Sequence, residues 1–145
     1  MKRHIVSFIA LLFCSSALAE SYLCIADLAT GFTFDEKTRE WRQAKFKADK
    51  KYIISKNKDG GNAWMVKEMG KKFPNAWCGA GFNDVGWLYC GEKQADFRMN
   101  KENLRFLAFY PFGYWTTGTK GFDKPVREGE DTPFIEIGKC TILKE

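Results

Sequence analysis

Cysteines are the side chains of this sequence with the clearest chemistry. The chain has five, of which Cys14 lies in an apolar N-terminal stretch and four follow it: Cys24, Cys78, Cys90 and Cys140. They form no C-x-x-C pair, and the single histidine, His4, stands at the start of the chain, so nothing completes a zinc-ligand set. In an exported chain, an even number of cysteines predicts disulfides rather than a metal site.

The spacing of the cysteines favours one of the three possible pairings. Cys78 and Cys90 flank residues 82–86, Phe-Asn-Asp-Val-Gly, which predict a turn. A hairpin around this turn would place the two sulfurs opposite each other. Cys24 would then pair with Cys140 and join the first strand to the last. The other two pairings stay open, because spacing alone does not choose between them.

The chain offers few catalytic side chains. His4 falls in an N-terminal segment that we expect to be removed, and the only serines beyond that segment are Ser21 and Ser55. A Ser-His-Asp or Cys-His mechanism is therefore excluded. Carboxylates could still hydrolyse a glycosidic bond, and one late loop holds candidates: Glu128, Glu130 and Asp131. Such acidic clusters are usually just solvated, so we expect no enzyme and no cofactor.

The N-terminus predicts export. Basic residues at 2 and 3 precede an apolar run, 5–13, that is too short to span a bilayer comfortably, and Ala17-Leu18-Ala19 fits the signal-peptidase pattern. We expect residues 1–19 to be a signal peptide cleaved before Glu20, and residues 20–145 to be a single domain in the periplasm or outside the cell. An uncleaved anchor is the weaker alternative. Lipidation of Cys14 is weaker still, because bulky Phe13 precedes it.

The net charge and composition exclude some classes of partner. Cleavage removes Lys2 and Arg3 from 23 basic residues and leaves all 18 acidic ones, so the mature net charge is +3. This balance is too mild to indicate a polyanion, so we expect no nucleic-acid partner. We also expect no stable membrane insertion after cleavage. The mature part keeps 21 of 23 aromatic residues, which favours a β-rich core.

Short strands account for most of the mature chain. Alternation and turn residues predict them at 22–26, 31–34, 41–46, 52–55, 63–66, 86–90, 96–99, 104–109 and 134–143. We therefore predict an all-β fold, an antiparallel up-and-down meander of about eight or nine strands, closed as a small barrel or folded as a sandwich. In the last strand the apolar positions run Ile135, Ile137, then Cys140, Ile142, so we place a β-bulge at Gly138.

One segment, 110–133, interrupts the strands. It is rich in glycine, proline and charge, and a loop of this length is usually functional or mobile. Its aromatic residues Tyr114, Trp115 and Phe122 are candidates for partner binding. The simpler interpretation is that Phe112, Tyr114 and Trp115 extend the preceding strand into the core. Residues 116–131 hold few large apolar groups, so we expect them to contribute little burial.

Several motifs resemble those of a group of small exported bacterial proteins with no assigned function. They are Tyr22-Leu23-Cys24 with residues 30–34, Leu104-Arg105-Phe106, and the Thr-Pro-Phe-Ile-Glu-Ile-Gly-Lys-Cys ending at Cys140. The resemblance covers most of the mature chain and implies export and a single domain, but no catalytic residue. The early Tyr-x-Cys and late Cys are also similar in arrangement to periplasmic lysozyme inhibitors. The Ser-Gly-x-x-Tyr type of motif is missing, so that similarity is one of fold.

These observations favour a non-catalytic binding or inhibitory module, whose partner would be an envelope or extracellular protein or glycan. The alternative is a carrier that holds a small apolar ligand inside a barrel, although large aromatic residues could equally fill such an interior. A carboxylate-based glycan hydrolase is the third hypothesis.

Overall fold

The computed structural model describes residues 20–58, 60–91, 96–119 and 125–143. The expected signal peptide, 1–19, lies outside these residues, and so does Phe122. The described part is built from nine strands and one short 3₁₀ helix: β1 (Ser21–Asp35), β2 (Glu40–Phe46), β3 (Lys51–Lys56), β4 (Trp64–Glu68), β5 (Ala76–Cys78), β6 (Trp87–Cys90), β7 (Asp96–Asn100), β8 (Arg105–Tyr110), η1 (Tyr114–Thr116) and β9 (Phe134–Leu143).

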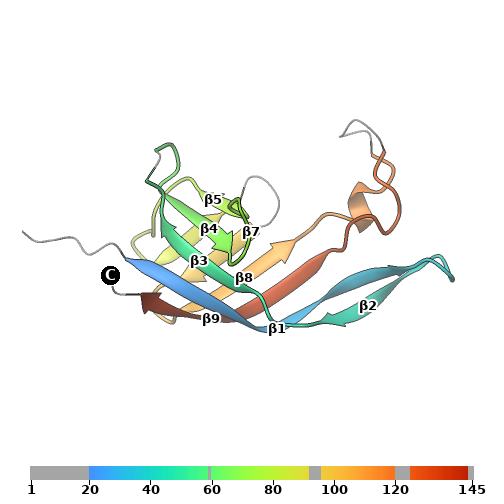
Figure 1. Cartoon of the computed structure of the whole chain (residues 1–145), viewed down its shortest axis with the longest axis horizontal. Helices are drawn as coiled ribbons and strands as arrows, with labels where there is room; N and C mark the ends of the chain where they lie inside the picture. The colour runs from blue at the N-terminus through green and yellow to red at the C-terminus, as the bar shows by residue number, and fades with distance from the viewer. Residues whose placement is uncertain (1–19, 59, 92–95, 120–124, 144–145) are drawn as a thin grey trace, which may run out of the picture.

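The strands form one antiparallel sheet that curls into a nearly closed barrel (Figure 1). Eight of the strands follow the order β5-β4-β3-β1-β9-β8-β7-β6, in which β9 lies beside β1, and the ninth strand, β2, pairs with β1 outside this order. The gap between β5 and β6 is bridged by two backbone hydrogen bonds between Trp77 and Gly91. The predicted meander is confirmed, and of the two predicted architectures it is the barrel that forms.

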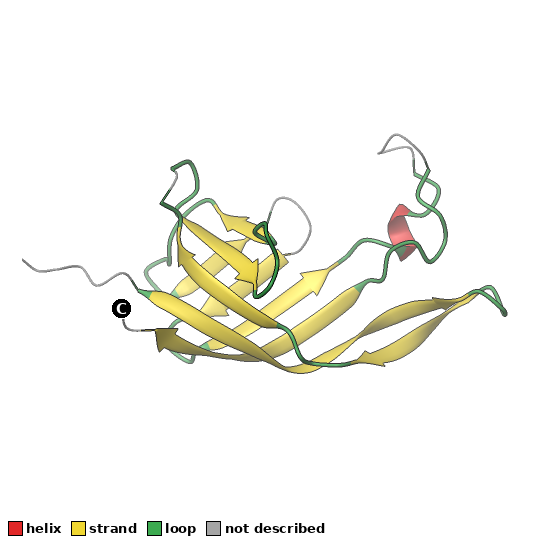
Figure 2. Cartoon of the chain, in the orientation of Figure 1, coloured by secondary structure: helices red, strands yellow, loops and turns green. Residues whose placement is uncertain are grey.

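Strand β1 is longer than the sequence predicts. Alternation indicates two separate strands, 22–26 and 31–34, whereas the chain runs through both as 15 continuous residues. The first part of β1 pairs with β3, and its last part pairs with β2, from Ala29 with Phe46 to Asp35 with Glu40. The β1–β2 hairpin therefore extends beyond the end of the barrel (Figure 2).

Both expected disulfides are present. Cys24 is bonded to Cys140, directly opposite it on the adjacent strands β1 and β9. Cys78 is bonded to Cys90 and ties β5 to β6 at the position where the backbone pairing of the barrel is thinnest. Two disulfides favour an oxidising location outside the cytoplasm.

The prediction of a bulge at Gly138 is wrong. The buried residues Glu136, Gly138 and Cys140 alternate without a break along β9, and Ile135 and Ile137 point outward. The register shift lies in the facing strand, between Ala26 and Leu28 of β1. The apolar pattern misled the prediction because this strand carries isoleucines on its outer face and a glutamate on its inner face.

Candidate binding surface

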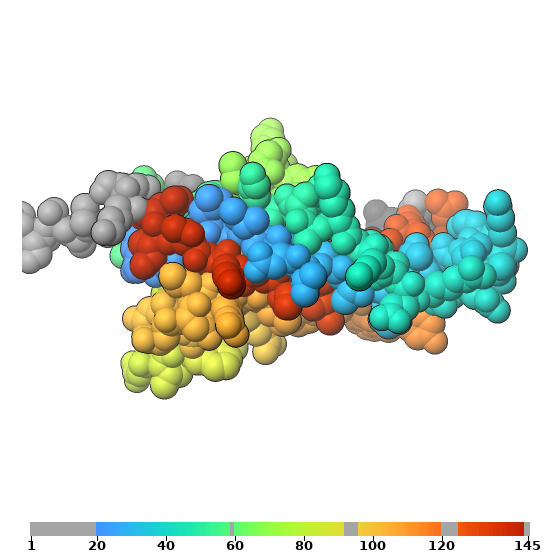
Figure 3. Space-filling model, turned by 90° about the horizontal axis from the view of Figure 1, so that it is seen from below, coloured from blue at the N-terminus to red at the C-terminus, as the bar shows by residue number. Residues whose placement is uncertain are grey.

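The outer face of β1, β9 and β8 carries apolar side chains that the core does not use. The pairing sets Leu28 beside Ile137 and Ile137 beside Leu107, while the next row places Ile135 beside Phe109. Leu28 is 64% exposed, Ile135 48% and Ile137 43%. Figure 3 shows this face, with β1 in blue, β9 in red and β8 in orange. An antiparallel sheet that packs one face on the core normally exposes polar residues on its other face. Exposed apolar residues at these positions therefore indicate a surface suited to binding.

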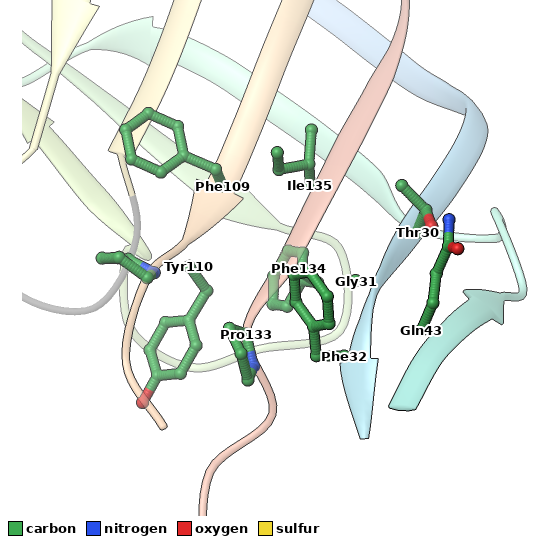
Figure 4. Close-up of a pocket in the computed structure, with 10 residues that line it drawn as sticks. Thr30, Gly31, Phe32, Gln43, Phe109, Tyr110, Pro133, Phe134 and Ile135 are labelled. Carbon is green, nitrogen blue, oxygen red and sulfur yellow. The ribbon is translucent and has the colours of Figure 1, made fainter. Parts of the chain in front are cut away.

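A groove of about 390 Å³ continues this face toward the β1–β2 hairpin (Figure 4). Its walls come from four strands and two prolines: Thr30, Gly31, Phe32, Gln43, Phe109, Tyr110, Pro111, Pro133, Phe134 and Ile135. Phe32 is 52% exposed although it is large and apolar. The groove therefore offers a mainly apolar surface to a partner, with the amide of Gln43 at its side.

A series of aromatic rings leads from the groove to the candidate residue Trp115. The rings of Phe134 and Tyr110 are stacked at 5.9 Å, Tyr110 and Phe112 lie 5.2 Å apart, and Phe112 is stacked on Trp115 at 5.9 Å. The Tyr110 hydroxyl donates a hydrogen bond to Asp131 Oδ1 at 3.0 Å. Burial, this bond and the Asp131 charge raise the pKa of Tyr110 to about 12. Trp115 is 62% exposed and so extends the surface to the loop.

Phe112, Tyr114 and Trp115 do not extend strand β8, so the simpler sequence interpretation is wrong. Strand β8 ends at Tyr110, and Tyr114 and Trp115 lie exposed in the 3₁₀ helix. The ring of Tyr114 meets that of Trp41 edge-on at 5.7 Å, and Trp41 Nε1 donates a hydrogen bond to Glu128. The described part of the segment therefore packs on the β1–β2 hairpin.

The three candidate carboxylates of this segment have structural partners. Glu128 accepts the Trp41 bond, and Asp131 accepts the Tyr110 bond. Glu130 accepts a hydrogen bond from the Arg127 amide at 3.0 Å. These contacts give each carboxylate a role in holding the segment.

The inner face holds one charged cluster that the sequence analysis missed. The side chain of Glu136 is 3% exposed, lies 2.9 Å from Lys50 Nζ, and accepts a hydrogen bond from Tyr52 at 2.5 Å. Burial first, and then Glu136, raises the pKa of Tyr52. The position of Cys140 could have indicated that Glu136 is buried. A disulfide-bonded cysteine faces inward, and Glu136 lies four residues away on the same side of the strand.

Aromatic side chains fill the middle of the described interior, and a hollow of about 570 Å³ remains beside Glu136. Phe97 is stacked on Phe106 at 5.0 Å, and Tyr52 meets both rings edge-on. Tyr22, Trp64 and Phe82 form a second aromatic group near the other end of the core. A ligand in the middle of the barrel would have to displace these rings, whereas one at the outer face would not.

No protein-family model, curated protein or solved structure matches the chain. Within the described ranges, no helix is both long and apolar enough to cross a bilayer. No cluster of three potential metal-ligating His, Cys, Asp or Glu residues occurs there either.

Proposed function

We propose that the mature chain is a non-catalytic binding module that acts in the periplasm or outside the cell. The observation that carries this proposal is the row of exposed apolar side chains on strands whose inner face already forms the core. Exposing Leu28, Phe32 and Ile135 costs solubility, and such patches typically mark interaction sites. The lack of any histidine beyond His4 supports a role that needs no acid-base chemistry.

The partner that fits best is an apolar segment of an envelope or extracellular protein, flanked by acidic residues. The apolar side chains extend along β1 and β9 and into the groove, which suits an extended chain better than a compact ligand. Cations lie at one end and along one side of this strip, since Lys139 lies opposite Ile25 and Lys45 lies opposite Thr30. Trp115, beyond the groove, adds an exposed aromatic anchor of the kind that commonly dominates interface energetics.

Site-specific photocrosslinking in the exporting cell tests this proposal. A photoreactive phenylalanine analogue replaces Phe32 in the groove or, as a matched control, Val85, which is 63% exposed in the turn before β6. Position 32 should form an adduct with a defined protein, and position 85 should not. Adding Ile135→Lys to the Phe32 probe should suppress the adduct because it places a charge in the groove.

Three results would contradict the proposal. Equal adducts at both positions would indicate non-specific contact, and an adduct that survives Ile135→Lys would place binding elsewhere. An adduct with a small apolar molecule instead of a protein would favour the carrier hypothesis.

A further inference from the structure

A second surface lies on the outer face of β6, β7 and β8, beyond Leu107 from the groove (Figure 3, yellow to orange). We propose that it binds acidic sugar residues of a glycan, with Trp87 packing on the sugar ring and Arg98 and Arg105 holding its anionic group. This site lies beside the protein-binding surface, with Leu107 at their border, and goes beyond the protein-binding role proposed above.

The strand register brings these side chains to one face. Trp87 pairs with Asn100, which pairs with Arg105, and in the next row Tyr89 pairs with Arg98. Paired residues project to the same side of a sheet, so the indole and both guanidinium groups share the outer face. They surround a hollow of about 300 Å³ whose lining includes Trp87, Arg98, Asn100, Asn103, Arg105 and Leu107.

Aromatic contacts hold the key groups in place. The ring of Tyr89 is stacked beside that of Trp87, with centroids 6.0 Å apart and planes 18° apart. The Arg98 guanidinium lies 5.6 Å from the Tyr89 centroid and 5.8 Å from that of Phe109. Cation–π contacts of this kind restrict the guanidinium without neutralising it. Trp87 remains 44% exposed, so its ring is available to a ligand.

Arg98 and Arg105 differ from the other described arginines because they form no salt bridge within the described part of the chain. Arg39, Arg42 and Arg127 each form a salt bridge with a nearby carboxylate. Arg98 and Arg105 form none with any residue in the described part of the chain, although both flank the same hollow. Two cations that line one hollow and have no salt-bridge partner among the described residues attract an anion. Guanidinium groups bind carboxylates and sulfates through paired hydrogen bonds.

The combination of groups selects the ligand class. A bare inorganic anion would leave Trp87 unused, and a neutral sugar would leave both arginines without a partner. A uronic or sulfated sugar has an apolar C–H face for the indole and an anionic group for the arginines. The hollow lies at the small end of ligand-site volumes, which run from about 300 to 1,000 Å³, and so suits a single ring of a longer chain.

Isothermal titration with defined oligosaccharides tests the site on the protein purified after export. The probes are a galacturonic acid trimer, its methyl ester, and a sulfated heparin-derived oligosaccharide with its desulfated form. At least one acidic probe should bind, and its neutral form should bind about tenfold more weakly or not at all. Trp87→Ala and Arg105→Gln should each weaken binding of the acidic probe about tenfold.

Matched controls separate this site from general charge and aromatic effects. Phe73→Ala and Arg39→Gln remove an exposed aromatic ring and an exposed arginine outside the hollow, and both should leave affinity within about twofold. Circular dichroism melting should show that all four variants stay folded. If neither acidic probe binds, or if acidic and neutral probes bind equally, the proposal is wrong.

A membrane partner is the remaining competitor, and vesicles distinguish it. If vesicles of anionic phospholipid bind and lose binding in Trp87→Ala while the sugars do not bind, the surface is a lipid-contact site and the glycan proposal is overturned. Sugar binding that depends on Trp87 and Arg105, without vesicle binding, supports it. Either outcome leaves the photocrosslinking test of the groove unaffected.

Discussion

Inside the barrel, the Tyr52 hydroxyl donates a hydrogen bond to Glu136 Oε2 at 2.5 Å, while Lys50 Nζ lies 2.9 Å from Oε1 of the same carboxylate. Lys50 also stands 3.6 Å above the ring of Phe134. A buried carboxylate needs such partners, because an uncompensated charge away from water is costly. The three residues thus connect β9 with β3 and the segment before it from within.

Tyr52→Phe should lower the free energy of unfolding by about 1.5 to 3 kcal/mol, because it removes a hydrogen bond to a buried charged group. Tyr22→Phe is the matched control, since Tyr22 bonds to Glu20, which is exposed at the start of the described chain. Tyr22→Phe should lower the free energy of unfolding by less than Tyr52→Phe does. Urea titration with the disulfides intact measures both variants, and a larger loss for Tyr22→Phe would contradict the importance of the buried pair.

Alkaline pH should destabilise the fold. The pKa values of Tyr22, Tyr52 and Tyr110 are raised from 10, chiefly by burial, so the folded state keeps phenol protons that the unfolded chain releases. Their contribution is complete below pH 10 and declines as pH rises toward the folded pKa, about 12 for Tyr110. Tyr110→Phe should make this decline shallower between pH 10 and about 12. Denaturant titrations across that range would refute the expectation if both proteins gave parallel curves.

Gly138→Ala should destabilise the barrel by about 1 to 3 kcal/mol or more, as overpacking does. A Cβ at this position would lie 2.1 Å from the Ile25 carbonyl oxygen and 2.7 Å from the Phe106 ring. Gly79→Ala is the control, because a Cβ there meets nothing within 4 Å. Thermal unfolding compares the two. Equal melting temperatures would show that β1 and β9 can separate at the register shift without cost.

Replacing residues 117–130 with a Gly-Ser linker should loosen the hairpin and leave the barrel folded. In the sheet, β2 pairs only with β1, and this segment supplies the Glu128 partner of Trp41 and the Gly129 backbone against Phe34. Amides of β2 should exchange faster with deuterium, while amides of β4 serve as the internal control. Global unfolding would make the segment part of the barrel core, and unchanged protection of β2 would show that the packing contributes nothing.

Local sequence determined much of the framework. Turn residues and alternation located most of the strands because those signals act over a few neighbouring residues. The spacing around residues 82–86 identified the Cys78–Cys90 pair. The remaining cysteines then had one arrangement left. The sequence also favoured a barrel over a sandwich, because a disulfide between Cys24 and Cys140 joins the terminal strands and favours closure.

Only the tertiary structure decided which face of each strand is buried and which side chains gather on the exposed surfaces. Alternation shows that Ile135 and Ile137 share a face but not which face is buried, and the usual rule that apolar residues point inward failed on β9. Glu136 is tolerated inside because Lys50 and Tyr52 arrive from a distant part of the chain. Trp87 and Arg105 likewise meet only through the register of three strands. Sequence patterns record periodicity along one strand, whereas partners across strands depend on pairings between residues far apart in the chain.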